Sequence, residues 1–198
     1  MTRIWLVGED ELCLSVLDRL LADTPTLEAF RRDNTCGFGR LKVNATKYSA
    51  TAEAGLPVIA LTDLDDRACP GDLLTEWLPG GRHSDFLLRV AVREVEAWLL
   101  ADRPGFAAHF GAKLTSIPAF PETCADAKAE LLGIVSGTRK ARWKGMLPDE
   151  GRRAPGPDYN DCLRAFVRER WSPAEAQQRA PSLAKAIERL GELAARHR

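Results

Sequence analysis

The chain has 198 residues, of which 45% are hydrophobic and 28% are charged, and its formal net charge at pH 7 is zero. These values are ordinary for a soluble globular protein with a real core, built as one domain or one domain with a helical appendage. No apolar run approaches membrane-spanning length, and residues 1–25 do not resemble a cleavable signal peptide. We therefore predict a cytoplasmic protein with no membrane partner.

The cysteines support the same compartment. The chain has five of them, Cys13, Cys36, Cys69, Cys124 and Cys162, and no two are close enough to form a CxxC pair. An odd number without close pairs argues against a zinc ribbon or a disulfide framework. The pattern fits reduced thiols in a cytosol.

Charge is distributed unevenly along the chain. Residues 1–102 carry 11 Lys and Arg against 17 Asp and Glu, a net charge of −6, whereas residues 103–198 carry 17 against 11, a net charge of +6. A metal site beside a surface for an anionic substrate produces this asymmetry, and so do two halves that attract each other. We predict an α/β core over residues 1–102 and a helical, basic region over residues 103–198 that packs on it.

The chain begins with a strand, an acidic turn and a helix. Residues 3–7 predict a buried strand, and apolar residues at helical spacing predict a helix over residues 12–21. Asp10 and Glu11 fit the first helical turn, where the helix macrodipole favours anions, and we interpret them as capping residues. Glu9 lies at the carboxyl end of the strand, where a functional role is an equally good interpretation.

The next stretch has weaker signals. Residues 23–36 predict a loop, and residues 37–43 predict either a second strand or a glycine-rich loop. Asn44 is a candidate cap for a short helix over residues 48–54.

The central element is the strand predicted over residues 57–62. Its continuous apolar run is typical of a strand buried on both faces of a parallel sheet. Open parallel sheets bind ligands beyond the carboxyl ends of their strands. Asp63 and Asp65 lie at that end and, if the extended geometry persists, point to one side and could share a divalent cation. A solvated acidic turn explains the same residues equally well.

A helix over residues 70–78 and a buried strand over residues 86–92 follow. The alternation of strands and helices predicts an α/β fold with a mostly parallel sheet of Toprim or Rossmann type, flanked by helices. The last strand leads into acidic residues 93–102, so three strands end in carboxylates. Because the carboxyl ends of parallel strands meet at one edge, these acids together predict a metal site there.

Glu94 and Glu96 compete for a place in that site. If the helix starts before Glu94, the two side chains diverge by about 200° and only one can face the site; we favour Glu94. Arg93 could instead pair internally with these acids.

Residues beyond 103 predict helices over 104–110, 125–135, 158–168 and 181–195. Between the second and third of these lies a basic segment with one aromatic residue: Arg139, Lys140, Arg142, Trp143 and Lys144. Four cations around a tryptophan could bind nucleic-acid phosphates and stack on a base. A solvated basic loop is the alternative.

Several common catalytic motifs do not occur. The chain has no GxxxxGK[ST] loop, no GxGxxG after the first strand, no GxSxG and no HExxH. A nucleotide-hydrolysing motor, a dehydrogenase, a serine hydrolase and a zinc protease are therefore poorly supported.

An acidic residue after the first strand and a DxD after a later buried strand, as in residues 6–11 and 61–65, resemble the Toprim (topoisomerase–primase) domain. Residues 93–102 and 181–190 extend the likeness to small bacterial Toprim-like proteins related to the nuclease part of overcoming-lysogenization-defect nucleases. The first strand of Toprim domains usually ends in Glu-Gly, whereas the order here is Gly8-Glu9, so either Glu9 or Glu11 could take the catalytic position.

The resemblance implies a nuclease that uses Mg²⁺ or Mn²⁺ to cleave phosphodiesters. It assigns Asp63 and Asp65 as catalytic metal ligands, Glu9 as a ligand or general base, and Glu94 as a candidate ligand of a second metal ion. It also implies nucleic acid as a partner and a possible partner ATPase in defence against phage. The alternative is a non-catalytic docking or regulatory subunit of such an ATPase.

Overall fold

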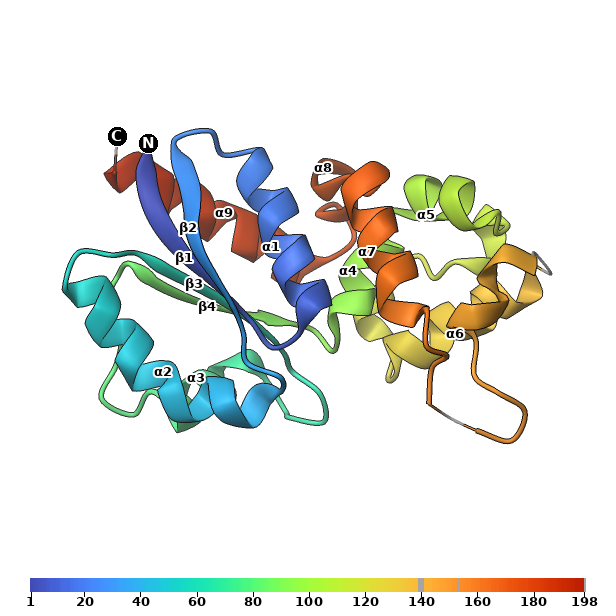
Figure 1. Cartoon of the computed structure of the whole chain (residues 1–198), viewed down its shortest axis with the longest axis horizontal. Coiled ribbons are helices and arrows are strands. Elements are labelled where there is room, and N and C mark those ends of the chain that lie inside the picture. Colours follow the sequence, from blue (N-terminus) through green and yellow to red (C-terminus); the bar gives the residue numbers. More distant parts are fainter. Residues whose placement is uncertain (139–140, 153, 198) are drawn as a thin grey trace.

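The computed structural model describes residues 1–138, 141–152 and 154–197. Its centre is a four-stranded, all-parallel sheet in the order β2-β1-β3-β4, with helices on both faces (Figure 1). The strands are β1 (Thr2–Gly8), β2 (Leu27–Asn34), β3 (Val58–Asp63) and β4 (Phe86–Ala91). This arrangement confirms the predicted α/β fold with a parallel sheet.

The helices of the α/β part are α1 (Glu11–Ala22), α2 (Phe38–Glu53) and α3 (Pro70–Trp77). The helices that follow are α4 (Val95–Ala101), α5 (Arg103–Phe110), α6 (Ala127–Gly137), α7 (Tyr159–Glu169), α8 (Pro173–Ala176) and α9 (Pro181–Arg196). Short 3₁₀ turns form η1 (Leu114–Ser116), η2 (Pro121–Thr123) and η3 (Ala141–Met146).

Alternate residues of the strands face opposite layers, as the pleat of a sheet requires. Leu6 of β1 and Leu61 of β3 belong to the core shared with α1 and α9, whereas Val7 and Ala60 belong to the core shared with α2 and α3. Both faces are therefore covered by helices (Figure 1).

The connections that follow β1 and β3 run over opposite faces of the sheet. From β1 the chain runs through α1 to the edge strand β2, then returns through α2 on the other face to β3. The connection after β3 runs through α3 on that same face, opposite to α1. Open parallel sheets bind ligands beyond the carboxyl ends of two strands connected in this way. We call the place between the ends of β1 and β3 the crevice.

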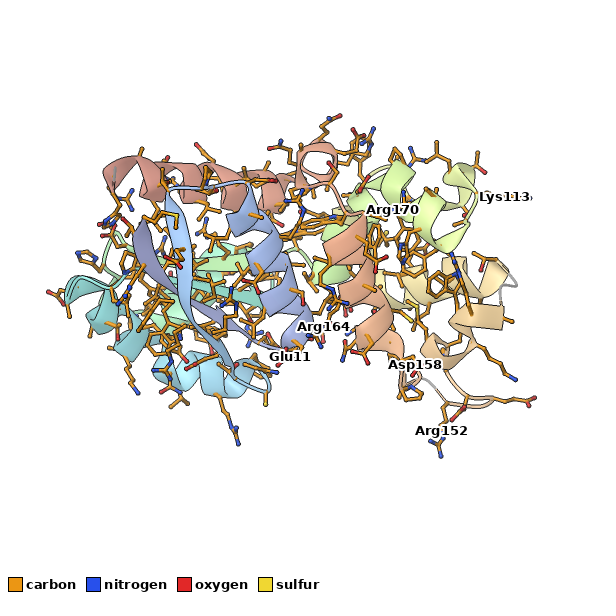
Figure 2. All side chains as sticks on the ribbon, turned by 45° about the horizontal axis from the view of Figure 1, so that its top comes forward. Glu11, Lys113, Arg152, Asp158, Arg164 and Arg170 are labelled. Carbon is orange, nitrogen blue, oxygen red and sulfur yellow. The ribbon has the colours of Figure 1, made fainter. Side chains whose placement is uncertain are left out.

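Helices α4 to α8 pack beside the α1 face and share its hydrophobic core, to which Trp98, Phe106 and Phe166 contribute. At the surface of this junction, Arg164 of α7 lies 3.8 Å from Glu11 at the start of α1 (Figure 2). The helical region thus packs directly on the α/β unit.

The last helix returns to the sheet. Helix α9, which the sequence places with the helical region, lies against β4, and Arg196 at its end pairs with Asp85 at 2.9 Å. The hydroxyl of Thr2 donates to the carbonyl of His197 at 3.1 Å, so the two ends of the described chain lie side by side (Figure 1).

Two sequence predictions for residues 23–54 are wrong. Residues 27–34 form β2 instead of a loop, and a single helix, α2, replaces both the strand or glycine-rich loop and the short helix that the sequence predicts. β2 is an edge strand with exposed, charged positions, so its residues lack the apolar alternation of a buried strand. In α2 the buried residues Leu41, Ala45, Tyr48 and Ala52 recur at helical spacing, and the Asn44 amide donates to a carbonyl within the helix.

Within the described part of the chain, no helix is long and apolar enough to cross a membrane. All five cysteines lie in that part, and all five are free thiols. The thiol of Cys13 is buried among α1 side chains, whereas those of Cys36 and Cys69 are exposed.

Candidate carboxylate site

Glu9 joins the ends of β1 and β3. Its amide donates to the carbonyl of Leu61 at 3.2 Å, so the β1 ladder continues one residue beyond Gly8. Its carboxylate accepts a hydrogen bond of 2.6 Å from the hydroxyl of Thr62 and a longer one of 3.4 Å from the amide of Asp63. These two donors on β3 hold the Glu9 carboxylate at the crevice.

Close packing explains the glycine that precedes Glu9. A Cβ at Gly8 would lie 2.7 Å from the carbonyl oxygen of Asp10 and 2.7 Å from the side chain of Leu14. Only glycine lets α1 begin so close to the strand end. The order Gly8-Glu9 therefore follows from the approach of α1 and still places Glu9 at the crevice.

The two acids after Glu9 have other partners. Asp10 is the N-cap of α1, and its carboxylate accepts from the amide of Cys13 at 2.8 Å, which confirms its predicted capping role. Glu11 lies in the first helical turn, is exposed, and accepts from the side-chain amide of Asn34 at 3.0 Å.

Asp63 and Asp65 do not point to one side. Asp63 ends β3, and its carboxylate accepts from the amide of Val95 at 2.8 Å. The amides of Leu64 and Asp65 both donate to the carbonyl of Arg93, which turns the chain, and Asp65 adopts a left-handed conformation with φ of 52°. Asp65 is exposed. The prediction that Asp63 and Asp65 share a cation requires an extended chain through both residues. The extended chain ends at Asp63.

The Arg93 side chain belongs to the same turn. Its guanidinium donates to the carbonyls of Asp65 and Arg67, each at 3.0 Å. Arg93 therefore holds the loop after β3 and does not pair with the neighbouring glutamates.

Glu94 and Glu96 both reach one cation, and the condition for their predicted divergence is not met. Helix α4 begins at Val95, and Glu94 is an extended N-cap residue, so helical divergence does not apply. The ammonium of Lys128 lies 3.8 Å from Glu94 and 3.5 Å from Glu96. Both glutamates are therefore near the crevice, and Glu96 is the more deeply buried.

Glu96 is only 2% exposed, and its two oxygens differ. One accepts a hydrogen bond of 2.8 Å from the hydroxyl of Tyr159 in α7. The other, Oε2, is buried and has no hydrogen-bond partner among the described residues. Because a buried carboxylate oxygen without a donor is costly, this atom marks a place where a cation or proton would be favourable.

The pKa values of Asp63 and Glu96 are both raised, first of all by burial. Burial raises the pKa of Asp63 well above its usual range, and the charges of Glu96 and Glu9 raise it further. Burial also raises the pKa of Glu96, although Lys128 and the Tyr159 hydroxyl favour its ionised form. Burial lowers the pKa of Lys128, but the charges of Glu96, Glu94 and Asp63 outweigh this effect and raise it, so the ammonium stays charged.

We call Glu9, Asp63, Glu94 and Glu96 the carboxylate cluster. Oxygen donors of this kind suit Mg²⁺ and Mn²⁺. As placed, no three Asp, Glu, His or Cys side chains of the described chain stand close enough to hold one ion. The cluster therefore offers donor atoms and an unpaired buried oxygen, but not a formed coordination shell.

A cavity of about 500 Å³ adjoins the cluster. Glu94 and Lys128 line it together with Asp126, Leu132 and Pro148. A substrate in this cavity would meet the cluster beside the Lys128 ammonium.

The basic segment is only partly described, because Arg139 and Lys140 lie outside the described residues. Trp143 is buried and donates from its indole nitrogen to the carbonyl of Phe110 at 3.0 Å. Its ring packs on His109, with centroids 5.4 Å apart, which leaves little of the ring accessible to a base. Arg142 and Lys144 are exposed.

Sequence reasoning missed the residues that fix the cluster. Thr62 was visible beside Asp63 as a polar residue within an apolar strand, but Lys128 and Tyr159 lie in helices distant in sequence. Only the packing of α6 against α4 and of α7 against α1 brings them to Glu96.

Comparisons were made with protein-family models, with curated proteins and with solved structures, and none of the three gives a match. The Toprim resemblance therefore stays a prediction from the motifs. The geometry of the carboxylate cluster is independent of it.

Proposed function

We propose that the carboxylate cluster binds Mg²⁺ or Mn²⁺ and that the protein is a nuclease that cleaves phosphodiesters with it. The observation that carries the proposal is the buried, unpartnered Oε2 of Glu96 beside Asp63, whose pKa is raised by burial and by that same glutamate. Their position at the carboxyl ends of neighbouring parallel strands supports a ligand site.

The proposed ligands are Asp63, Glu96 and Glu9, with Glu94 as a further candidate. The resemblance also assigns Asp65 as a ligand. Its carboxylate is exposed and lies 3.9 Å from the guanidinium of Arg67, so Asp65 is a weaker candidate. A bound divalent ion would neutralise charge on the phosphate and lower the pKa of a bound water.

The remaining side chains orient the site. The Thr62 hydroxyl fixes one oxygen of Glu9, which leaves the other to accept a proton from an attacking water. The raised pKa of Tyr159, caused by burial and by Glu96, keeps its hydroxyl protonated and donating to Glu96. Lys128 supplies a positive charge at the mouth of the adjoining cavity.

Nucleic acid is the proposed substrate, and the exposed Arg142 and Lys144 support a contact with its phosphates. The five free thiols support a reducing, cytoplasmic setting. A partner ATPase and a role in phage defence rest on the resemblance alone.

Cleavage of labelled DNA and RNA, single- and double-stranded, with Mg²⁺ or Mn²⁺ tests the proposal. We expect cleavage that chelation abolishes, that Glu96→Gln and Asp63→Asn remove, and that Asp66→Asn retains. Asp66 is a matched control because it is exposed and only three residues from Asp63. No cleavage of any of the four substrates by the wild type would contradict the nuclease and leave the docking-module alternative.

A further inference from the structure

Another cavity lies at the free edge of β4, away from the carboxylate cluster. It has a volume of about 270 Å³ and opens between α3 and α9, which cover opposite faces of the sheet. Four cationic side chains line it, Arg82, Arg89, Lys185 and Arg189. No acidic side chain is among its lining residues.

Arg89 is the innermost of the four. It lies within β4 between Leu87 and Ala91, which pack in the core under α9, and it is largely buried. Its Nε donates to the carbonyl of Leu88 at 2.9 Å. Among the residues that the structure describes, its two terminal nitrogens have no hydrogen-bond acceptor. No carboxylate of these residues lies within 4.0 Å of its guanidinium.

The neighbouring charges leave the cavity positive. Arg189 pairs with Glu192 at 2.7 Å and Lys185 pairs with Glu188 at 3.1 Å, both at the surface of α9. Arg82 has no ion pair within the described chain. Two of the four cations are therefore unbalanced.

The cost of this arrangement shows at Arg89. Burial, together with the charges of Arg82 and Arg189, lowers the pKa of its guanidinium to about 10. Burying an arginine beside like charges is unfavourable unless an anion joins them. An anion in the cavity would relieve both effects.

The side of the cavity toward α3 is apolar. Pro70 and Leu74 of α3 and Val90 of β4 form it. We propose that this cavity binds a small phosphomonoester, with the phosphate on Arg89 and Arg82 and an apolar body against Leu74 and Val90. A dianion matches the two unbalanced charges, and the planar guanidinium fork matches phosphate oxygens.

The test uses the full chain in a phosphate-free buffer with EDTA at constant ionic strength, and titrates it with phenyl phosphate in a calorimeter. We expect saturable binding, with inorganic phosphate binding more weakly because it lacks the apolar body. Arg89→Gln and Arg82→Gln should each weaken the binding of phenyl phosphate about tenfold or more, because each removes a charge-assisted contact. Arg168→Gln makes an equal charge change at an exposed position on α7. Its affinity for phenyl phosphate should stay within about twofold of that of the wild type.

Absence of saturable binding to the wild type overturns the proposal, as does wild-type affinity in Arg82→Gln. Equal weakening by Arg168→Gln would also overturn it, because the effect would then be one of net charge. Should Arg89→Gln fail to fold, the exposed Arg82 decides the outcome alone. Asp63→Asn should bind phenyl phosphate as the wild type does, so this test and that of the nuclease fail independently.

Discussion

At the scale of single residues, Glu96 shows how the site departs from what stability alone would favour. Tyr159 and Lys128 engage one oxygen, and the other is buried without a partner among the described residues. A buried carboxylate with an unpaired oxygen lowers the free energy of unfolding unless a ligand joins it. Such local costs are expected where a chain keeps a binding site.

The first prediction concerns Asp63→Asn without divalent ions. Because burial, Glu96 and Glu9 raise the pKa of Asp63, ionising it costs stability in the folded state. The penalty is present above the raised folded pKa and is absent below the unfolded value of about 4. The mutant should therefore melt higher at pH 8, by roughly 2–4 °C for each kcal/mol relieved.

The gain in melting temperature of Asp63→Asn over the wild type should shrink as the pH falls and vanish near pH 4. Thermal melts of both proteins across this range, in EDTA, measure it, with Asp66→Asn as the control that should show no such trend. A mutant that melts lower than the wild type at pH 8 would contradict the account of Asp63.

The second prediction separates the two acids that follow β1. Glu9→Gln should remove metal-dependent cleavage with little change in melting temperature, because its carboxylate lies at the crevice. Glu11→Gln should retain cleavage and lose a few tenths of a kcal/mol to about 1 kcal/mol, through its helix-terminus position and its contacts with Asn34 and Arg164. Parallel melts and cleavage assays decide between them, and an inactive Glu11→Gln would reverse the assignment.

At the scale of elements, the buried strands and several helices could be predicted, whereas the exposed edge strand β2 and the helix α2 could not. β3 is apolar throughout and ends in Asp63, so both its burial and its functional end follow from the sequence. β2 carries charged residues at solvent-facing positions, and one of them, Arg31, lies over the Trp5 ring at 4.2 Å. Its strand character comes from pairing with β1, which no local pattern encodes.

The third prediction concerns the docking of α9 on the sheet. Hydrogen bonds from Arg196 and His197 outweigh the effect of burial and lower the pKa of Asp85. A lowered pKa contributes stability above the unfolded value of about 4, which is lost as the pH falls through the folded value. Asp85→Asn should therefore lower the melting temperature at pH 7.

That difference between Asp85→Asn and the wild type should shrink below about pH 4 and close only below the lowered folded pKa of Asp85, where Asp85 is protonated in both states. Asp23→Asn is the comparison, because Asp23 pairs with Arg19 at 2.8 Å at the accessible end of α1 and holds no distant elements together. Equal, small effects of the two substitutions at pH 7 would show that the Asp85 contacts do not hold α9.

The fourth prediction follows from the burial of Trp143. Its ring packs with His109 and Phe110, and its indole donates to a buried carbonyl. Trp143→Ala should therefore cost about 3–5 kcal/mol in the free energy of unfolding. Chemical denaturation measures the loss. Unchanged stability with weaker binding of single-stranded nucleic acid would restore the stacking role instead.

At the scale of the whole molecule, the reversal of charge after residue 102 has a structural use. Glu94 and Glu96 at the start of α4 meet Lys128 of α6, and Glu11 meets Arg164 of α7. The attraction of two halves, one of two explanations that the sequence left open, is therefore present at the site itself.

The candidate site could be predicted only where it follows the strand ends. Glu9 and Asp63 could be found from an apolar strand followed by an acid, because the edge of a parallel sheet collects such residues. Asp65 was expected beside Asp63, but a left-handed turn separates them. The burial of Glu96 and its contacts with Lys128 and Tyr159 depend on how α6 and α7 pack, which has no local signature.

The most direct test of the central claim is a calorimetric titration of the chain with Mn²⁺ at pH 7.5, for the wild type, Glu96→Gln, Asp63→Asn and Asp66→Asn. The account predicts saturable binding to the wild type and to Asp66→Asn, and loss of binding in the other two, because each removes a carboxylate of the cluster. Identical Mn²⁺ affinity in all four proteins, or no binding to the wild type, would contradict it.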